Sequence, residues 1–136
     1  MEETLHSDDD IHLPKLAIMH PTRDLLLLLP HLPVNDSLEI DYEAANPDLL
    51  VQLADNAEAV TRIMHMGIAA VGQLLAHSAA KIKSGELPGD TVEALGWLLA
   101  ELGEVAGVAQ CLAIACRQYT FDYTPHTVTI IHNTKL

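Results

Sequence analysis

The side chains best suited to chemistry in this chain are its histidines, cysteines and paired carboxylates. Eight histidines occur among 136 residues, and the run from His6 to His12 offers nitrogen and oxygen ligands close together. Its spacing matches no metal-ligand motif of known geometry. His65 and His77 lie too far apart to be the i, i+4 pair that two ligands on one helix face would form. We therefore interpret the run as solvated acidic chain and predict no metal site.

The two cysteines, Cys111 and Cys116, are weak candidates for a nucleophile. Arg117 adjoins Cys116, but apolar surroundings disfavour the thiolate that a reactive cysteine needs. Residues five apart on a helix point to different sides, so a mutual disulfide is not expected. We predict two buried thiols, which is typical of a reducing compartment.

No catalytic motif accompanies these residues. Glu101 and Glu104 lie three apart, but a working carboxylate pair needs a cleft, and solvated helix surface is the better interpretation. The patterns GxxxxGK[ST], GxGxxG and GxSxG do not occur. The seven basic residues never cluster, which disfavours direct binding of nucleic acid. We predict no enzyme and no cofactor.

Two long helices are predicted, at residues 46–84 and 90–119. Asn46 is a good N-cap residue and is followed by a proline at the first helical position. Asp90 is the predicted cap of the second helix, with Glu93 completing a capping box. Because the connection between the helices is short, they should lie antiparallel as a helical hairpin. The predicted fold class is therefore mainly α.

The helices are flanked by less regular chain within one predicted domain, residues 1–136. Prolines divide an acidic N-terminal segment, residues 1–45, in which Thr22 to Leu29 can form two helical turns. The leucine run within those turns should pack on the helices. A C-terminal extension, residues 120–136, is rich in β-forming residues and predicts a short β segment.

Apolar residues recur along both helices in a three-four alternation typical of coiled-coil seams. We expect these two seams to pack on each other as the intramolecular core. In the first helix the seam comprises Leu50, Leu53, Ala57, Val60, Met64, Gly67, Val71, Leu74 and Ser78. In the second it comprises Leu95, Leu98, Leu102, Val105, Ala109, Leu112, Cys116 and Tyr119.

A second apolar face remains on the other side of the second helix. Glycine within a soluble helix costs about 1 kcal/mol relative to alanine, and the usual reason for tolerating it is close approach of another backbone. We predict that this face mediates self-association into a homodimeric four-helix bundle. The alternative is cover by the N-terminal leucines or the C-terminal strands. The self-association residues are Gly96, Trp97, Ala100, Gly103, Gly107, Cys111 and Ile114.

The net charge of −12 is concentrated in the first half of the chain. Such acidity either maintains solubility or attracts a larger protein with a basic surface. The predicted partner-binding residues are Asp36, Glu39, Asp41 and Glu43.

The leading functional hypothesis is a small acidic interaction module that regulates or inhibits a larger protein, for example by occupying a basic nucleic-acid-binding groove. In style it is similar to inhibitors by which phages and mobile elements counter host defence. The alternatives are an assembly subunit that oligomerises within a complex, and a ligand-binding bundle or enzyme. The apolar runs 67–80 and 105–116 fall short of the roughly 20 residues that a membrane-spanning helix needs. We therefore expect no membrane partner and a cytoplasmic location.

Overall fold

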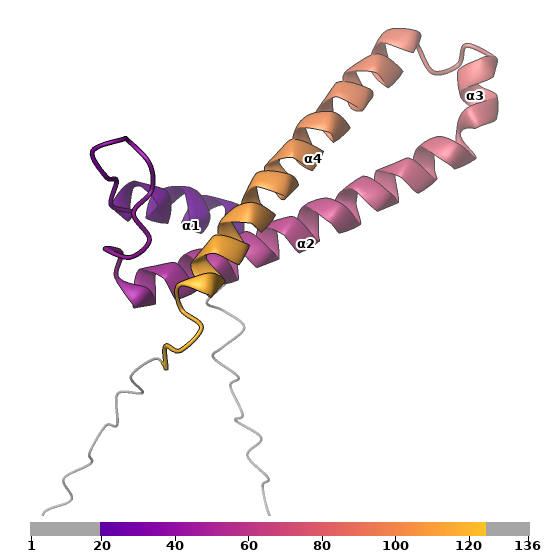
Figure 1. The fold of residues 1–136 in the computed structure, drawn as a ribbon. Coiled ribbons are helices and arrows are strands. Elements are labelled where there is room, and N and C mark those ends of the chain that lie inside the picture. Colours follow the sequence, from indigo (N-terminus) through magenta and orange to yellow (C-terminus); the bar gives the residue numbers. More distant parts are fainter. Residues whose placement is uncertain (1–19, 125–136) are drawn as a thin grey trace, which may run out of the picture.

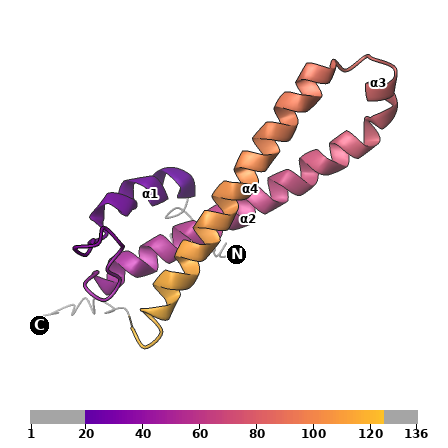
Figure 2. The ribbon, with the colours of Figure 1, turned by 45° about the horizontal axis from the view of Figure 1, so that its top comes forward.

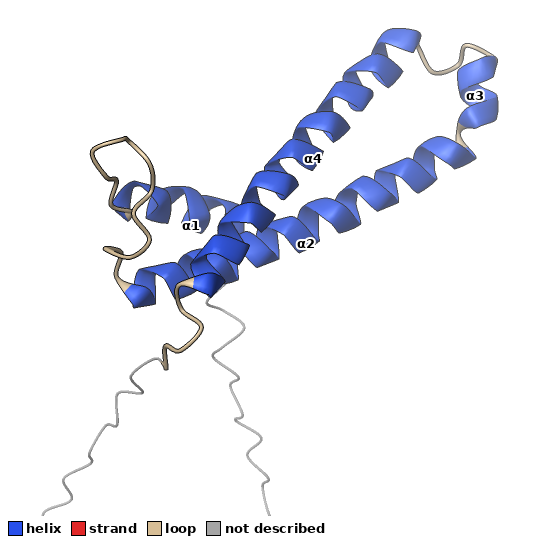
Figure 3. Ribbon diagram, in the orientation of Figure 1, coloured by secondary structure: helices blue, strands red, loops and turns tan. Residues whose placement is uncertain are grey.

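Helices and connecting loops make up the part of the chain that the computed structural model describes, residues 20–124. The elements in chain order are α1 (Pro21–Leu28), the 3-10 helix η2 (Leu29–His31), α2 (Pro47–His77), α3 (Ala79–Lys83) and α4 (Gly89–Gln118). Figure 3 shows that α2 and α4 dominate the molecule and that α3 joins them at one end. The prediction of a mainly α fold built on a long antiparallel helical hairpin is confirmed.

The first long helix begins where the sequence predicts and ends earlier. Asn46 accepts a hydrogen bond from the amide of Asp48 through its side-chain oxygen at 2.9 Å, and Pro47 follows it in the first turn. At Ser78 the backbone leaves the helical region, with φ −93° and ψ 6°. The predicted helix 46–84 is therefore divided into α2 and α3. Gly85, at φ +80°, then provides the left-handed conformation that terminates α3.

The second long helix begins one residue before the predicted cap. Pro88 has extended backbone angles, and its carbonyl accepts hydrogen bonds from the amides of Thr91 and Val92. Asp90 consequently lies inside the first turn of α4, where its carboxylate complements the helix dipole. The predicted capping box of Asp90 and Glu93 is wrong, because the proline backbone already fixes the start of the helix.

The flanking segments are more regular than expected at one end and less so at the other. The two predicted turns within 22–29 are confirmed as α1, and Leu25 is buried. Leu26 and Leu27 remain 60% and 64% exposed, so only part of the leucine run packs. Residues 120–124 form turns and irregular chain rather than the predicted strand, and the rest of that segment lies outside the described residues.

The core between α2 and α4 is made mainly of small side chains. Thr61 lies close enough to α4 for its hydroxyl to contact the carbonyl of Ala106 at 3.4 Å. Alanines at such positions let two helix backbones approach closely, because no long side chain separates them. The α4 residues buried there are Ala106, Ala109, Ala113 and Cys116, and those of α2 include Leu50, Leu53, Ala54, Ala57 and Val60.

The predicted seam is correct in α2 near its start and at Ala109 and Cys116 of α4, which are buried. It is wrong at three other positions of α4. Leu98, Val105 and Tyr119 are 53%, 43% and 49% exposed, whereas Ala106 is fully buried. Figures 1 and 2 show that α2 and α4 cross near the start of α2 and the end of α4 and diverge towards α3. Leu74, in the diverging half of α2, is 68% exposed. We call the diverging halves, residues 61–77 and 89–105, the arms.

Enlarging a side chain in the alanine contact should destabilise the fold. Ala106→Leu should lower the free energy of unfolding by about 1–3 kcal/mol, because a leucine there separates two closely packed backbones. Ala94 is exposed in the arm of α4, so Ala94→Leu should change it by less than about 0.5 kcal/mol. Urea denaturation followed by circular dichroism measures both. Equal stability of the two variants would contradict the packing described.

Candidate interaction surface

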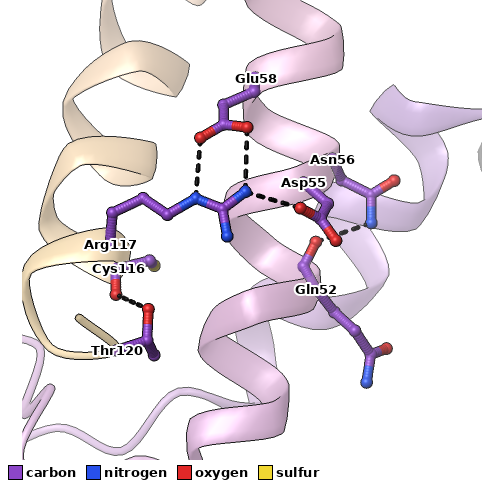
Figure 4. Close-up of polar contacts among 7 residues, drawn as sticks. All are labelled: Gln52, Asp55, Asn56, Glu58, Cys116, Arg117 and Thr120. Atoms are coloured by element: carbon purple, nitrogen blue, oxygen red, sulfur yellow. Dashed lines mark hydrogen bonds and ion pairs between the residues drawn. The ribbon is translucent and has the colours of Figure 1, made fainter. Parts of the chain in front are cut away.

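An ion-pair network joins the end of α4 to the first half of α2, where the two helices cross (Figure 4). We call this end of the hairpin, opposite α3, the crossing end. The Nε of Arg117 donates to Glu58 Oε1 at 2.9 Å, and its Nη2 donates to Glu58 Oε2 at 3.0 Å and to Asp55 Oδ1 at 2.6 Å. The hydrogen bonds from Arg117 lower the pKa of Glu58. All three side chains are roughly half exposed, so solvent screening keeps the energy of each pair small. The network orients the helices more than it stabilises them.

Aromatic residues make further contacts at the crossing end. Tyr42 and Tyr119 stack with ring centroids 5.3 Å apart, which attaches the loop before α2 to the end of α4. Burial raises the pKa of Tyr42. The hydroxyl of Tyr123 donates to Asp48 Oδ1 at 2.6 Å and so connects the chain after α4 to the first turn of α2. Specific contacts therefore hold this end of the molecule together.

The predicted partner-binding carboxylates lie in the loop of residues 32–46. Asn35 folds the loop, because its side-chain oxygen accepts hydrogen bonds from the amides of Ser37 and Glu39. The carboxylate of Asp41 accepts from the amide of Ala44 at 3.1 Å and is half-buried. It therefore helps to hold the turn. The other three residues are exposed; they are Asp36, Glu39 and Glu43.

This loop forms one wall of an apolar groove that the sequence analysis did not predict. The groove has a volume of about 580 Å³ and lies between α1, the loop and one side of α4. Ile40 and Tyr42 line it, and the chain alternates acidic and apolar residues from Glu39 to Glu43. That alternation was the only sequence signal for it. The other lining residues are Leu25, Leu26, Leu29, Glu104, Val105, Val108, Ala109, Cys111 and Leu112.

A second groove, of about 970 Å³, lies between α2 and α4 and is more polar. Arg62 and His65 line it from α2, and Gln110 and Ile114 line it from α4. Arg62 makes no ion pair with any carboxylate of residues 20–124. The Arg117 network closes one end. This groove combines both charge signs with apolar surface, so it indicates no single class of ligand.

The predicted self-association face is uncovered. No atom would contact a Cβ added at Gly96, Gly103 or Gly107, and Trp97 and Ile114 are 66% and 52% exposed. The glycines therefore serve no close contact within one copy of the chain. Cys111 and Ala100 are exposed on the same helix.

The prediction of two buried thiols is correct for one cysteine only. Cys116 is fully buried in the contact with α2, and burial raises its pKa. Cys111 is exposed, and it lies where α4 borders the open apolar groove. The two side chains have no disulfide between them.

Both long helices also have the length and mean hydropathy of a membrane-crossing helix. Only 11% of the most apolar window in α2 and 17% of that in α4 is buried within the structure. Length and composition alone are weak evidence for a membrane, because core helices of soluble proteins have them too. The low burial does show that these helices present apolar surface to their surroundings.

The described part of the chain contains no group of three or more residues able to hold a metal ion. His65 is exposed, and the Nδ1 of His77 lies 2.7 Å from the carbonyl oxygen of Gln73. The acidic run from His6 to His12 lies outside the described residues.

No protein-family model matches the chain, and neither curated proteins nor solved structures show significant similarity to it. Its function must therefore be argued from its own surfaces. The structure offers two unusual ones: the uncovered face of α4 and the apolar groove beside the acidic loop.

The contribution of the Arg117 network to stability should depend on pH. Because the pKa of Glu58 is lowered in the folded chain, its stabilising effect is complete above the ordinary pKa of a glutamate and is lost as the pH falls through the lowered value. Glu58→Gln should cost about 0.5–1 kcal/mol at neutral pH. Urea denaturation at several pH values should show the difference from wild type vanish in acid. A difference that persists in acid would contradict this assignment.

The two thiols should differ sharply in reactivity. Cys111 should react with a thiol reagent in the folded protein, whereas buried Cys116 should react only after unfolding. Cys111→Ser should remove the fast reaction, and Cys116→Ala should leave it. If both thiols of the wild-type protein react at the same rate under native conditions, the placement of α4 against α2 is wrong.

Proposed function

We propose that this chain is a small acidic protein-interaction module that functions as a cytoplasmic homodimer and binds a larger protein with a basic surface. The single observation that carries the proposal is the uncovered face of α4. Trp97 and Ile114 are both more than half exposed there. Contiguous apolar surface of this kind in a soluble protein usually marks an interface.

The glycines favour a helix as the cover. Each glycine in a helix costs about 1 kcal/mol relative to alanine. Gly96, Gly103 and Gly107 have open space around them in one copy of the chain. A second helix backbone could approach most closely at these positions, which would offset that cost.

The spacing along the face is complementary to itself, which favours a second copy as the partner. Apart from Trp97, the residues of the face that precede Gly107 are small, Gly96, Ala100 and Gly103, and the larger Cys111 and Ile114 follow it. In an antiparallel pair with Gly107 on the two-fold axis, each residue lies level with the one equally far on the other side. Gly103 would then lie level with Cys111 of the second copy, and Ala100 with Ile114.

Charge favours the same orientation. Residues 36–60 contain seven acidic and no basic side chains. Three of the seven, Asp48, Asp55 and Glu58, lie in the first half of α2 and contact Arg117 at the end of α4 or Tyr123 just after it. An antiparallel pairing about Gly107 would separate these carboxylates of the two copies, whereas a parallel pairing would bring them together and raise their repulsion. The acidic residues of the loop also remain free to contact a basic partner.

A membrane is a less suitable cover than protein. Glu101 and Glu104 are exposed within the most apolar stretch of α4. Each ionised side chain at the centre of a bilayer costs at least about 2.5 kcal/mol, unless it is paired. No basic residue lies between Glu93 and Cys116 on this helix to pair with them. In a soluble dimer both carboxylates can remain hydrated at the edge of the interface.

The proposal predicts a mass in solution of twice 14.8 kDa by light scattering. Gly103→Leu should weaken the dimer at least about tenfold by blocking close approach, even though leucine favours the helix by about 0.8 kcal/mol over glycine. Ala94→Leu, on another side of α4, is the matched control and should leave the mass unchanged. A single-copy mass for the wild-type protein at micromolar concentration would refute the homodimer, as would a Gly103→Leu dimer of undiminished affinity.

The register of the proposed antiparallel dimer can be tested separately. Gly103→Cys should form a disulfide with Cys111 of the second copy under mild oxidation, giving a covalent dimer on a non-reducing gel. Adding Cys111→Ser to that variant should abolish the cross-link. A covalent dimer that survives Cys111→Ser would contradict the axis at Gly107.

A further inference from the structure

We propose that the apolar groove between α1, the loop of residues 32–46 and α4 binds an amphipathic, positively charged helix of the partner protein. This assigns a place and a chemistry to the basic partner and therefore rests on the proposed function. The groove is separate from the self-association face except at Cys111, which borders both.

The floor of the groove is apolar and open to solvent. Leu26 of α1 is 60% exposed, Val108 of α4 is 68% exposed, and Ile40 of the loop is 39% exposed. These three side chains come from three different elements and line one cavity. An apolar ridge on a partner could bury all three together, at about 25 cal/mol for each Å² removed from water.

The charge around the groove favours a partner with positive charge. Glu104 is the one carboxylate among the lining residues, and no lysine, arginine or histidine lines the groove. Glu39, Asp41 and Glu43 are the chain neighbours of the lining residues Ile40 and Tyr42. The apolar floor thus has one carboxylate, that of Glu104, on its α4 wall, and the loop that forms the other wall carries three more next to its lining residues. Basic residues beside the partner's apolar ridge would complement both.

The walls of the groove are held in place before any partner binds. The loop is fixed by the amide of Asp41, which donates to the carbonyl of Pro33 at 2.9 Å, and by the stacking of Tyr42 on Tyr119. Leu25 anchors α1 in the core. A groove that is already formed avoids the cost of ordering its side chains upon binding.

The length of the groove fits a short helix. Its α4 wall extends from Glu104 to Leu112, which is about 12 Å along the axis at 1.5 Å per residue. The apolar anchors of a helix bound in a groove commonly lie at i, i+3 or i+4, and i+7, a span of about 10.5 Å. Two to three turns of partner helix therefore match the wall.

The test uses three synthetic peptides of equal length with the full-length protein. The first has leucines on one helical face and lysines on the other, the second replaces lysine with glutamate, and the third replaces leucine with glycine. Only the leucine–lysine peptide should bind, as measured by isothermal titration calorimetry, and its affinity should fall as salt increases. Equal binding of the leucine–glutamate peptide would overturn the charge assignment, and binding of the lysine–glycine peptide would overturn the role of the apolar floor.

Surface variants then locate the binding. Val108→Lys places a positive charge in the groove and should weaken leucine–lysine binding at least about tenfold while leaving the dimer intact. Ile114→Lys, at a position outside the groove that is also more than half exposed, should leave peptide binding unchanged while disrupting the dimer. The combination Glu39→Gln, Glu43→Gln and Glu104→Gln should weaken binding and reduce its salt dependence.

These outcomes separate the two proposals. If Val108→Lys binds the leucine–lysine peptide as tightly as wild type, the groove is not the site, whatever the mass of the protein. If Ile114→Lys remains a dimer but Val108→Lys loses the peptide, the groove assignment stands and the α4 self-association face is wrong. Circular dichroism of each variant confirms that the helices are retained before binding is measured.

Discussion

Two helices can bury only one side of each other, and here even that contact covers only part of their length. The alanines of α4 that face α2, Ala106, Ala109 and Ala113, let the backbones approach closely. Arg117, bound to Glu58 and Asp55, fixes the orientation of the two helices where they cross. Beyond this contact the helices diverge (Figure 1) and their apolar residues remain uncovered. The surfaces proposed for function follow from this limited contact.

The two proposed interactions use different sides of α4. One side presents glycines with open space around them, suited to another helix backbone. Another side forms the apolar groove with α1 and the acidic loop. Because each side uses different residues, apart from Cys111, self-association and partner binding can occur together. In this proposal the negative net charge would attract a basic partner from a distance.

Local signals in the sequence predicted the helices well, because caps and prolines act over a few residues. Asn46 and Pro47 locate the start of α2 correctly. The α4 seam was correct at Ala109 and Cys116 but wrong at Val105, because this helix is apolar on nearly all sides and its periodicity alone does not select the buried side; the larger Val105 was favoured over the neighbouring Ala106. The groove was missed because its walls come from α1, the loop and α4, which only the tertiary fold brings together.

The central claim is that a second copy of the chain covers the open face of α4. Trp97 is the only tryptophan of the chain and is 66% exposed in one copy, so its fluorescence reports on that face directly. We predict that its emission shifts to shorter wavelength and becomes protected from iodide quenching as the protein concentration rises through the dissociation constant of the dimer. Emission that stays at the wavelength of solvated indole and remains fully quenchable at all concentrations would contradict the account.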